Sequence, residues 1–409
     1  MKMKYSIVFL FLLFLTGCKS EVAKSISIKE DVTFLSDDAL EGRQTGTDGE
    51  KAAADYIAKR FEKLDAQGKG TNGFLQPFTF KPKTNPHQKV KYNVKEGDST
   101  ITGTNVLGFI NNDAENTIII GAHYDHLGYG AEGSLHCGEK AIHNGADDNA
   151  SGVAVMLNLA EKLKEKNTNN NYLFMAFSGE EMGLLGSNYF VKNPTIDIKK
   201  VNYMINMDMV GRLKADSTLA VYGVGTSPIL KQTLKAHNEN FKLIQKESGI
   251  GPSDHTSFYN ADIPVLHFFT GQHEDYHKPS DDFEKLNYKG MQTISNYIFN
   301  IISDLNDNGK LPFRKTKNES EETPRFKVGL GVIPDYLFDG KGMRIDGISE
   351  DKPAQKAGLQ KGDIVVKLGD SVVVDMMSYM KVLATFEKGN STKVVVDRKG
   401  EMVEANIEF

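Results

Sequence analysis

The chain has 409 residues, of which 39% are hydrophobic and 25% are charged, and its formal net charge is −5. This length predicts two or three domains with cores of their own, and the ordinary apolar content excludes an intrinsically disordered chain. The mildly acidic balance, without a basic stretch, gives no electrostatic reason to expect nucleic acid as a partner. The two cysteines allow at most one disulfide bond.

The N-terminus has the pattern of an export signal. Two lysines precede an apolar run at residues 7–15, which is shorter than the roughly 20 residues of a membrane-spanning helix. The sequence LTGC at residues 15–18 resembles the bacterial lipobox, in which the cysteine is acylated and becomes the mature N-terminus. We therefore expect a lipoprotein signal peptide at residues 1–17, a lipid anchor on Cys18 and a place in the bacterial cell envelope, at its periplasmic or outer-membrane face. The alternative is a plain secretory signal with an incidental cysteine.

Helical patterns alternate with short apolar runs between about residues 25 and 305. Residues 50–64 place apolar side chains at helical spacing, and a helical stripe recurs at residues 153–163. The apolar runs have the length of strands and lack polar alternation, which is typical of strands buried on both faces. These runs are residues 117–120, 172–177, 201–207 and 263–269. The order predicts an α/β fold with a mainly parallel central sheet flanked by helices.

Acidic residues and histidines follow these runs. They occur in GAHYDH at 121–126, NGADDNASG at 144–152, SGEE at 178–181, Asp208 and DYHKPSD at 275–281. The carboxyl ends of the strands line the crevice in which an open α/β sheet binds its ligands. Because burying so many carboxylates without partners costs several kcal/mol for each group, bound cations are the natural resolution. Imidazole and carboxylate ligands together suit Zn²⁺.

The five segments, in this order and at these intervals, resemble the motif blocks of the M28 family of zinc peptidases. The leading segment at residues 35–61 is also similar to that family. The resemblance implies a zinc-exopeptidase domain at residues 18–305 with two Zn²⁺ per chain. It further implies a metallo-exopeptidase, in the first place an aminopeptidase that removes N-terminal residues from peptides.

Carried over residue by residue, the family pattern implies a role for each motif residue. The implied metal ligands are Asp147, which bridges the two ions, His123 and Asp208 at one site, and Glu181 and His277 at the other. Glu180 is implied as the general base that takes a proton from the attacking water and passes it to the leaving amine. The other histidines of these segments, His126 and His143, are expected in loop or supporting roles.

Three further carboxylates are expected to support the ligands. Asp125 should orient the imidazole of His123. The family suggests that Asp148 is the partner of Asp147 across a cis, non-proline peptide bond. Asp281, four residues after the last ligand, is expected beside the site.

Two segments follow the peptidase-like region. Residues 306–324 are polar and charged and contain Gly and Pro, which predicts a linker. Residues 325–409 contain KVGLGV at 327–332 and a glycine-punctuated stretch at 347–369 that resemble a small, β-rich PDZ domain of the type found in bacterial proteases. The resemblance implies that backbone N–H groups bind the C-terminal carboxylate of a peptide or protein, from Gly329, Leu330 and Gly331. The alternative is a domain that packs on the peptidase without a ligand.

Other functions stay open at the level of sequence. A carboxypeptidase or dipeptidase of the same fold is an alternative, because the ligands fix amide hydrolysis but not which end of the peptide is held. Glutaminyl cyclases share the scaffold, but their pockets are lined with tryptophan, and this chain has no Trp. A catalytically inactive peptide-binding PDZ receptor belongs to a different class. It would lack a ligand or the base, and none of the six positions is missing.

Overall fold

The computed structural model describes most of the chain. The described residues are 27–82, 92, 94–95, 97–130, 132–164, 166–317, 327–338 and 340–409. The expected signal peptide at residues 1–17 and the expected lipid site at Cys18 lie outside the described residues. Residues 318–326, where the expected linker meets the PDZ-like region, also lie outside them. Within the described ranges, we find no helix whose length and apolarity would suffice to cross a membrane.

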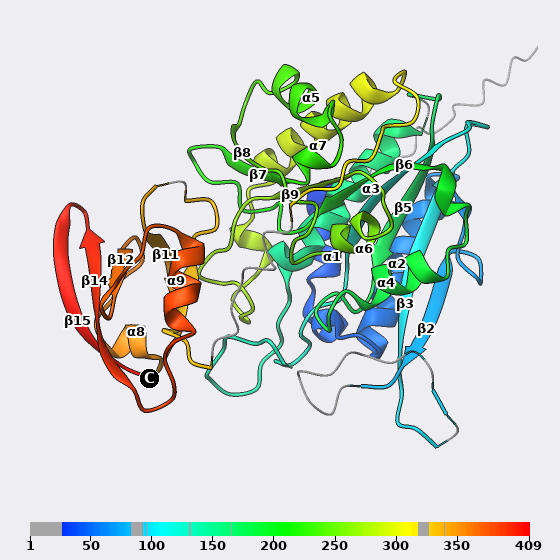
Figure 1. The fold of residues 1–409 in the computed structure, drawn as a ribbon. Coiled ribbons are helices and arrows are strands. Elements are labelled where there is room, and N and C mark those ends of the chain that lie inside the picture. Colours follow the sequence, from blue (N-terminus) through cyan, green and yellow to red (C-terminus); the bar gives the residue numbers. More distant parts are fainter. Residues whose placement is uncertain are drawn as a thin grey trace, which may run out of the picture.

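The larger domain is built around a nine-stranded sheet (Figure 1). Its strands are β1 (Gln67–Gly68), β2 (Leu75–Phe80), β3 (Ile101–Ile110), β4 (Thr117–His123), β5 (Asn171–Phe177), β6 (Val201–Met207), β7 (Thr218–Tyr222), β8 (Lys242–Lys246) and β9 (Val265–Phe269). They lie in the order β1-β3-β5-β4-β6-β9-β7-β8, with β2 paired to β3. The pairs β5–β4, β4–β6 and β6–β9 are parallel, whereas β3 and β7 pair antiparallel with β5 and β9. The predicted parallel centre is confirmed, and antiparallel pairs flank it.

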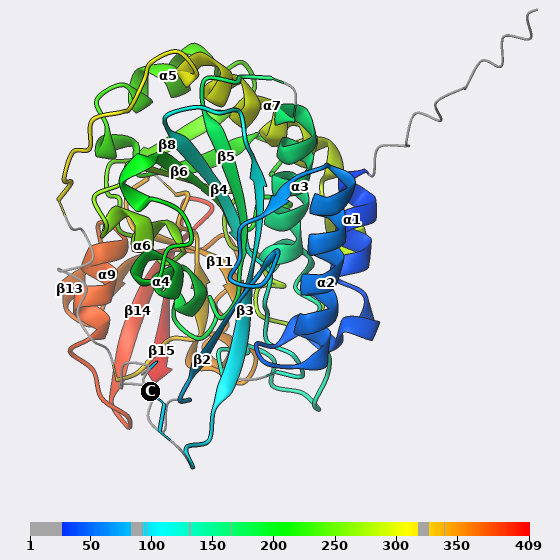
Figure 2. The same cartoon turned by 90° about the vertical axis from the view of Figure 1, so that its right-hand side faces the viewer.

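Helices cover both faces of this sheet (Figure 2). One face carries α1 (Ile28–Leu35), α2 (Asp48–Lys63), α3 (Gly152–Leu163) and α7 (Tyr288–Leu305); the other carries α4 (Leu185–Lys192) and α6 (His255–Tyr259), and α5 (Leu230–Ala236) lies near the β7–β8 edge. Short helical turns complete the domain at η1 (Asp38–Arg43), η2 (Ala146–Ser151), η3 (Ile198–Lys200), η4 (Val224–Thr226) and η5 (Phe283–Lys285).

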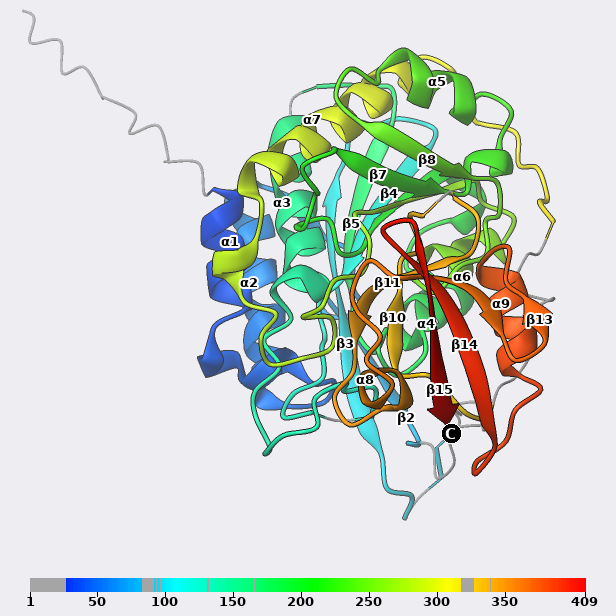
Figure 3. The same cartoon turned by 90° about the vertical axis from the view of Figure 1, so that its left-hand side faces the viewer.

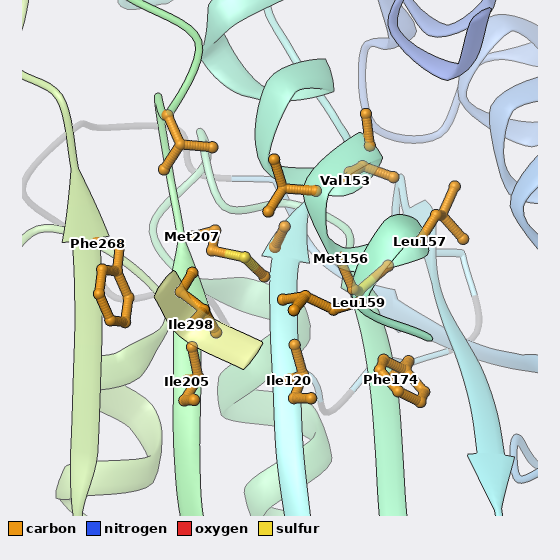
Figure 4. Packing of buried hydrophobic residues seen from close by; sticks show 14 of the residues in the cluster. Ile120, Val153, Met156, Leu157, Leu159, Phe174, Ile205, Met207, Phe268 and Ile298 are labelled. Carbon is orange, nitrogen blue, oxygen red and sulfur yellow. The ribbon is translucent and has the colours of Figure 1, made fainter. Parts of the chain in front are cut away.

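The central strands are apolar at every position because each face of the sheet has its own core. Successive side chains of a strand point to opposite faces. In β4, Ile118 and Ile120 belong to the core beneath α3, whereas Ile119 belongs to the core beneath α4 and α6. Figure 4 shows Ile120 in the same core as Val153, Met156 and Leu159 of α3. An apolar run without alternation is the result.

The strand directions bring the polar motifs to one edge of the sheet. β4 ends at His123, β5 ends just before the segment with Glu180, and β6 ends just before Asp208. Because β4 is parallel to both neighbours, these ends share the same edge. The loop after β9 contributes His277 to the same region.

The first part of the expected linker packs on the larger domain. Leu311 is buried, and the N–H of Arg314 donates to the carbonyl oxygen of Thr226 at 2.7 Å. The ring of Phe313 lies 5.5 Å from that of Tyr259. Residues 306–317 therefore pack along the surface of the larger domain instead of forming an exposed linker.

The C-terminal domain is a small antiparallel β structure with a core of its own (Figure 3). Its strands lie in the order β10-β11-β12-β14-β15, with β13 paired to β12. The elements are β10 (Val332–Pro334), β11 (Met343–Ile348), α8 (Pro353–Lys356), β12 (Ile364–Leu368), β13 (Ser371–Val372), α9 (Met376–Leu383), β14 (Ser391–Arg398) and β15 (Glu401–Glu408). The predicted small β-rich domain is confirmed.

Candidate functional site

The first group of candidate ligands lies where β4 and β6 end. The Nε2 atom of His123 lies 3.2 Å from Oδ1 of Asp148 and 3.4 Å from Oδ1 of Asp208. His123 and Asp148 are buried, and Asp208 is half-buried. One imidazole and two carboxylates converge within the distance at which they could share one metal ion.

A second group shares Asp148 with the first. The Nε2 atom of His277 lies 3.2 Å from Oδ2 of Asp148 and 3.3 Å from Oε2 of Glu181. The Nδ1 atom of His126 lies 2.8 Å from Oε1 of Glu181, and His126, Asp148 and Glu181 also meet the distances of a metal site. The two oxygens of Asp148 thus face different histidines, which is the geometry of a bridging carboxylate.

The structure contradicts the expectation that Asp147 is the bridge. Its Oδ1 atom accepts a hydrogen bond from the N–H of Gly211 at 2.6 Å, and its Oδ2 atom lies 3.1 Å from Nε2 of His273. The cis peptide bond joins Asp148 to Asn149 rather than Asp147 to Asp148. The two aspartates are neighbours in the chain, but their side chains project to different partners, and Asp148 rather than Asp147 lies between the two groups.

The charges of the second group favour ion pairing. Burial alone would raise the pKa of Glu181, as would the nearby Asp148, but His277 and His126 lower it to about 2. Burial would also lower the pKa of His277, whereas its contacts with Glu181 and Asp148 raise it to about 11. The carboxylates therefore gain from a positive charge at this position, whether from an imidazolium or from a metal ion.

The donor set fits zinc. The buried Nε2 atom of His123 has no hydrogen-bond partner in the described part of the chain and points between two carboxylate oxygens. Imidazole nitrogen and carboxylate oxygen are common zinc ligands. An unpartnered buried nitrogen beside two carboxylates is the arrangement that a metal ion would satisfy.

Glu180 adjoins both groups. Burial raises the pKa of its carboxyl group well above the ordinary value; His123 opposes this effect, and the carboxylates of Glu181, Asp208 and Asp254 add to it. Its backbone N–H donates to Oδ1 of Asp125 at 3.1 Å. The half-buried Glu180 thus occupies an acidic environment in which it can hold a proton.

Two expected supporting residues make distinct contacts. The Oδ1 atom of Asp125 lies 3.7 Å from Nδ1 of His123, and the carboxylate is held by Thr45 at 2.9 Å. The Oδ2 atom of Asp281 accepts hydrogen bonds from the backbone N–H groups of Asp147 and Asp148, at 3.0 and 3.1 Å. Asp281 therefore fixes the backbone at the bridging position.

The sequence indicates no role for Arg43 and only a loop or supporting role for His126. The guanidinium of Arg43 is buried and donates to four carbonyl oxygens, those of Leu35, Tyr124, Asn144 and Gly145. It thus joins α1 to the loops beside His123 and Asp148. The position of His126 three residues after His123 was the available signal, but only the fold shows its contact with Glu181.

The expected carboxylate-binding loop of the C-terminal domain has a suitable backbone. Leu330 is buried, Gly331 has φ +74°, and its carbonyl oxygen accepts from the N–H of Ser349 at 2.8 Å. Among the described residues, no hydrogen bond is donated by the N–H groups of Gly329 or Gly331.

Comparison with known proteins finds a different family model for each of two parts of the chain. Residues 105–302 match the model of peptidase family M28, and residues 313–409 match that of the PDZ domain. Aminopeptidase YwaD of Bacillus subtilis is 32% identical over 165 residues, 38% of this chain and 36% of that protein. The alkaline phosphatase isozyme conversion protein of Escherichia coli is 31% identical over 193 residues, 47% of this chain and 52% of that protein. The chain spans about half or less of the length of these relatives.

Solved structures support the fold of the larger domain. A zinc aminopeptidase from Bacillus subtilis superposes with a TM-score of 0.53 at 19% identity, covering 71% of this chain and 96% of that chain. A Zn-dependent exopeptidase from Parabacteroides distasonis superposes with a TM-score of 0.56 at 17% identity, covering 68% and 97%. At these identities the likeness establishes the fold.

Proposed function

Because the chain carries a domain of peptidase family M28 followed by a PDZ domain, we propose that it is a dizinc aminopeptidase that removes N-terminal residues from peptides. The observation that carries this proposal is the position of Asp148 between two groups of ligands, with Glu180 beside them. The names of the relatives, among them an aminopeptidase, are consistent with it.

The proposed metal ligands are the residues that meet at Asp148. They are His123 and Asp208 for one ion, Glu181 and His277 for the other, and Asp148 for both. When bound, a pair of zinc ions lowers the pKa of a water molecule and stabilises the negative charge that develops on the carbonyl oxygen.

In this proposal the chain itself moves the proton. Glu180 accepts a proton from the attacking water and delivers it to the nitrogen of the leaving amine. Asp125 holds the backbone of Glu180 through its N–H and also adjoins His123, so base and ligand keep a fixed relation. Positioning of this kind lowers the entropic cost of the reaction.

The acidity of the site favours the N-terminal end of a peptide. The ligand carboxylates and Glu180 balance the charge of two divalent ions, and the buried carboxyl group of Asp254 lies close enough to influence Glu180 as well. The nearby cation Arg43 already donates to four carbonyl oxygens. An α-ammonium group is therefore a better fit than an α-carboxylate.

The variant Glu180→Gln tests the role of the base. It should lower kcat by several orders of magnitude while two zinc ions stay bound, because the amide cannot accept the proton and the ligands are unchanged. Zinc content by elemental analysis and turnover of an aminoacyl anilide give the two readings. Retained turnover would disprove the assigned role.

The direction of cleavage is tested with peptides whose ends are blocked. Acetylation of the N-terminus removes a charge-assisted hydrogen bond, which is worth roughly 1.5–3 kcal/mol, about 10- to 150-fold in rate. Free peptides should be cleaved and acetylated ones resist, whereas C-terminal amidation should have little effect. The reverse pattern would identify a carboxypeptidase.

We also propose that the mature protein is anchored in the bacterial envelope by a lipid on Cys18, and that the PDZ domain binds the C-terminus of a peptide or protein. The LTGC sequence supports the first point. The N–H groups of Gly329 and Gly331, which donate to no acceptor among the described residues, support the second. Cys18→Ser should abolish incorporation of labelled fatty acid, and labelling of that variant would exclude the anchor.

A further inference from the structure

Charged side chains join the C-terminal domain to the larger domain. The Nζ atom of Lys214 lies 2.8 Å from Asp346 and 3.9 Å from Asp335, both carboxylates being buried. Lys361 lies 3.6 Å from Asp346 and 3.6 Å from Glu274 of the larger domain. Asp335 also pairs with Arg344 and Asp346 with Lys361 within the C-terminal domain, and Lys214 adds a cation from the larger domain, which favours the docked arrangement.

Close packing accompanies these charges. A Cβ atom on Gly271 would lie 2.8 Å from Cδ1 of the buried Leu337, so the glycine permits the approach of the C-terminal domain. A cleft of about 730 Å³ lies beside this contact, between residues of 274–280 on one side and of 347–361 on the other. The C-terminal domain and the loop that follows β9 form two walls of this cleft, and they approach each other at Gly271 and Glu274.

That loop carries one proposed ligand and fixes another. His277 reaches Asp148 and Glu181 from it. Asp281, at the end of the same loop, accepts the backbone N–H of Asp148, and His273 contacts the neighbouring Asp147. A shift of this loop would therefore displace His277 from Glu181 and Asp148 and disturb the backbone that carries Asp148.

The backbone of the loop needs support from outside. His277 has φ +55°, a left-handed conformation that is unfavourable for a residue with a Cβ atom. Its ring is held by the carbonyl oxygen of Gly133 at 2.8 Å, and its own carbonyl oxygen accepts from the N–H of Leu135 at 3.0 Å. The segment that makes these contacts also reaches the C-terminal domain, since Sγ of Cys137 lies 3.5 Å from the carbonyl oxygen of Glu350.

We propose that the docked PDZ domain is a structural part of the metal centre, holding the loop of residues 271–281 so that His277 and Asp148 meet at the second metal position. Both segments that flank His277 contact the PDZ domain, and the charges of Lys214 and Asp346 fix the docking. This inference rests on the proposed zinc function. It makes Asp346 and Lys214 positioning residues, because neither touches the ligands themselves.

The test compares charge reversals inside and outside the contact, in the full-length chain. Asp346→Lys should weaken the binding of one of two zinc ions about tenfold or more, the range found when groups that orient metal ligands are removed. Asp346→Glu, which keeps the charge, should bind zinc nearly as the parent chain does. Glu404→Lys is the matched control, because it reverses an exposed ion pair with Lys393 in the same domain. Zinc affinity is measured by competition with a chromophoric chelator.

Lys214→Glu breaks the same contact from the larger domain and should weaken the same ion, so the test does not depend on the folding of a changed PDZ domain. Wild-type zinc affinity in the folded Lys214→Glu variant would overturn the inference, as would an equal loss in Glu404→Lys. A parent chain that binds no zinc would instead refute the proposed function, so the two failures are distinguishable.

Discussion

At the scale of single residues, the choice between two adjacent aspartates decides the metal centre. Asp148 offers its two oxygens to different histidines, whereas Asp147 is held by Gly211 and His273 away from both groups. The motif at residues 144–152 contains Asp-Asp-Asn, and its sequence alone does not show which of the two carboxylates faces the crevice. Only the backbone path through η2 fixes this.

A matched pair of variants follows from that geometry. Asp148→Asn should lose most of the zinc at both positions, because an amide presents one oxygen where two are needed. Asp147→Asn should keep two zinc ions, since its amide oxygen can still accept from the N–H of Gly211. Elemental analysis after dialysis gives the comparison, and zinc loss in Asp147→Asn alone would restore the bridge expected from the sequence.

Glu50 gives the larger domain a stability that depends on pH. It is buried at the start of α2 beside Ser178 and Gly46, and burial raises its pKa from 4.5 to about 7, although these two hydrogen bonds oppose the shift. The folded chain thus binds this proton more tightly than the unfolded chain does. The stability that it contributes is complete below about pH 4.5 and is lost as the pH rises through about 7.

Glu50→Gln should remove this dependence. The parent chain should lose up to about 3 kcal/mol more of its free energy of unfolding than the variant between about pH 5 and pH 8. Gln can keep the hydrogen bonds, since the hydroxyl group of Ser178 can accept as well as donate. Urea unfolding at both pH values measures the difference, and equal slopes in the two proteins would assign the pH dependence to other groups.

At the scale of elements, the sequence predicts the strands at the centre of the sheet well. Residues 117–120 lie in β4, and residues 172–177 lie in β5. Apolar runs of this length without polar alternation are typical of strands that are buried on both faces. The antiparallel edge was not predicted. β2 and β3 contain polar and glycine positions, such as Gln76 and Gly103, whose burial depends on partners distant in sequence.

Loops account for the parts of the site that the sequence did not predict. The motif blocks predicted which segments meet, since parallel strands end at the same edge. They did not predict the role of Arg43, because a lone arginine gives no signal of the four carbonyl oxygens that it binds. Nor did they indicate that the PDZ domain contacts the larger domain, because a contact such as that of Lys214 with Asp346 leaves no local sequence pattern.

At the scale of the whole molecule, the two domains differ in what stabilises them. The core of the PDZ domain includes no residue of the larger domain. The larger domain instead gathers carboxylates, among them Asp148, Glu181 and Asp208, whose partners are histidines that could also serve as metal ligands. Metal binding should therefore contribute to the folding of the larger domain and very little to the core of the PDZ domain.

Removal of zinc tests this division in a single calorimetric scan. An ion present at 1,000 times its dissociation constant stabilises by about 4.1 kcal/mol, which corresponds to about 7 °C in the melting temperature of a domain of this size. A strong chelator should lower the transition of the larger domain by that amount and shift that of the PDZ domain far less. The same chelator saturated with zinc beforehand is the control. Equal shifts of both transitions would show that the two domains unfold as one unit, and no shift would show that the buried carboxylates are stable without metal.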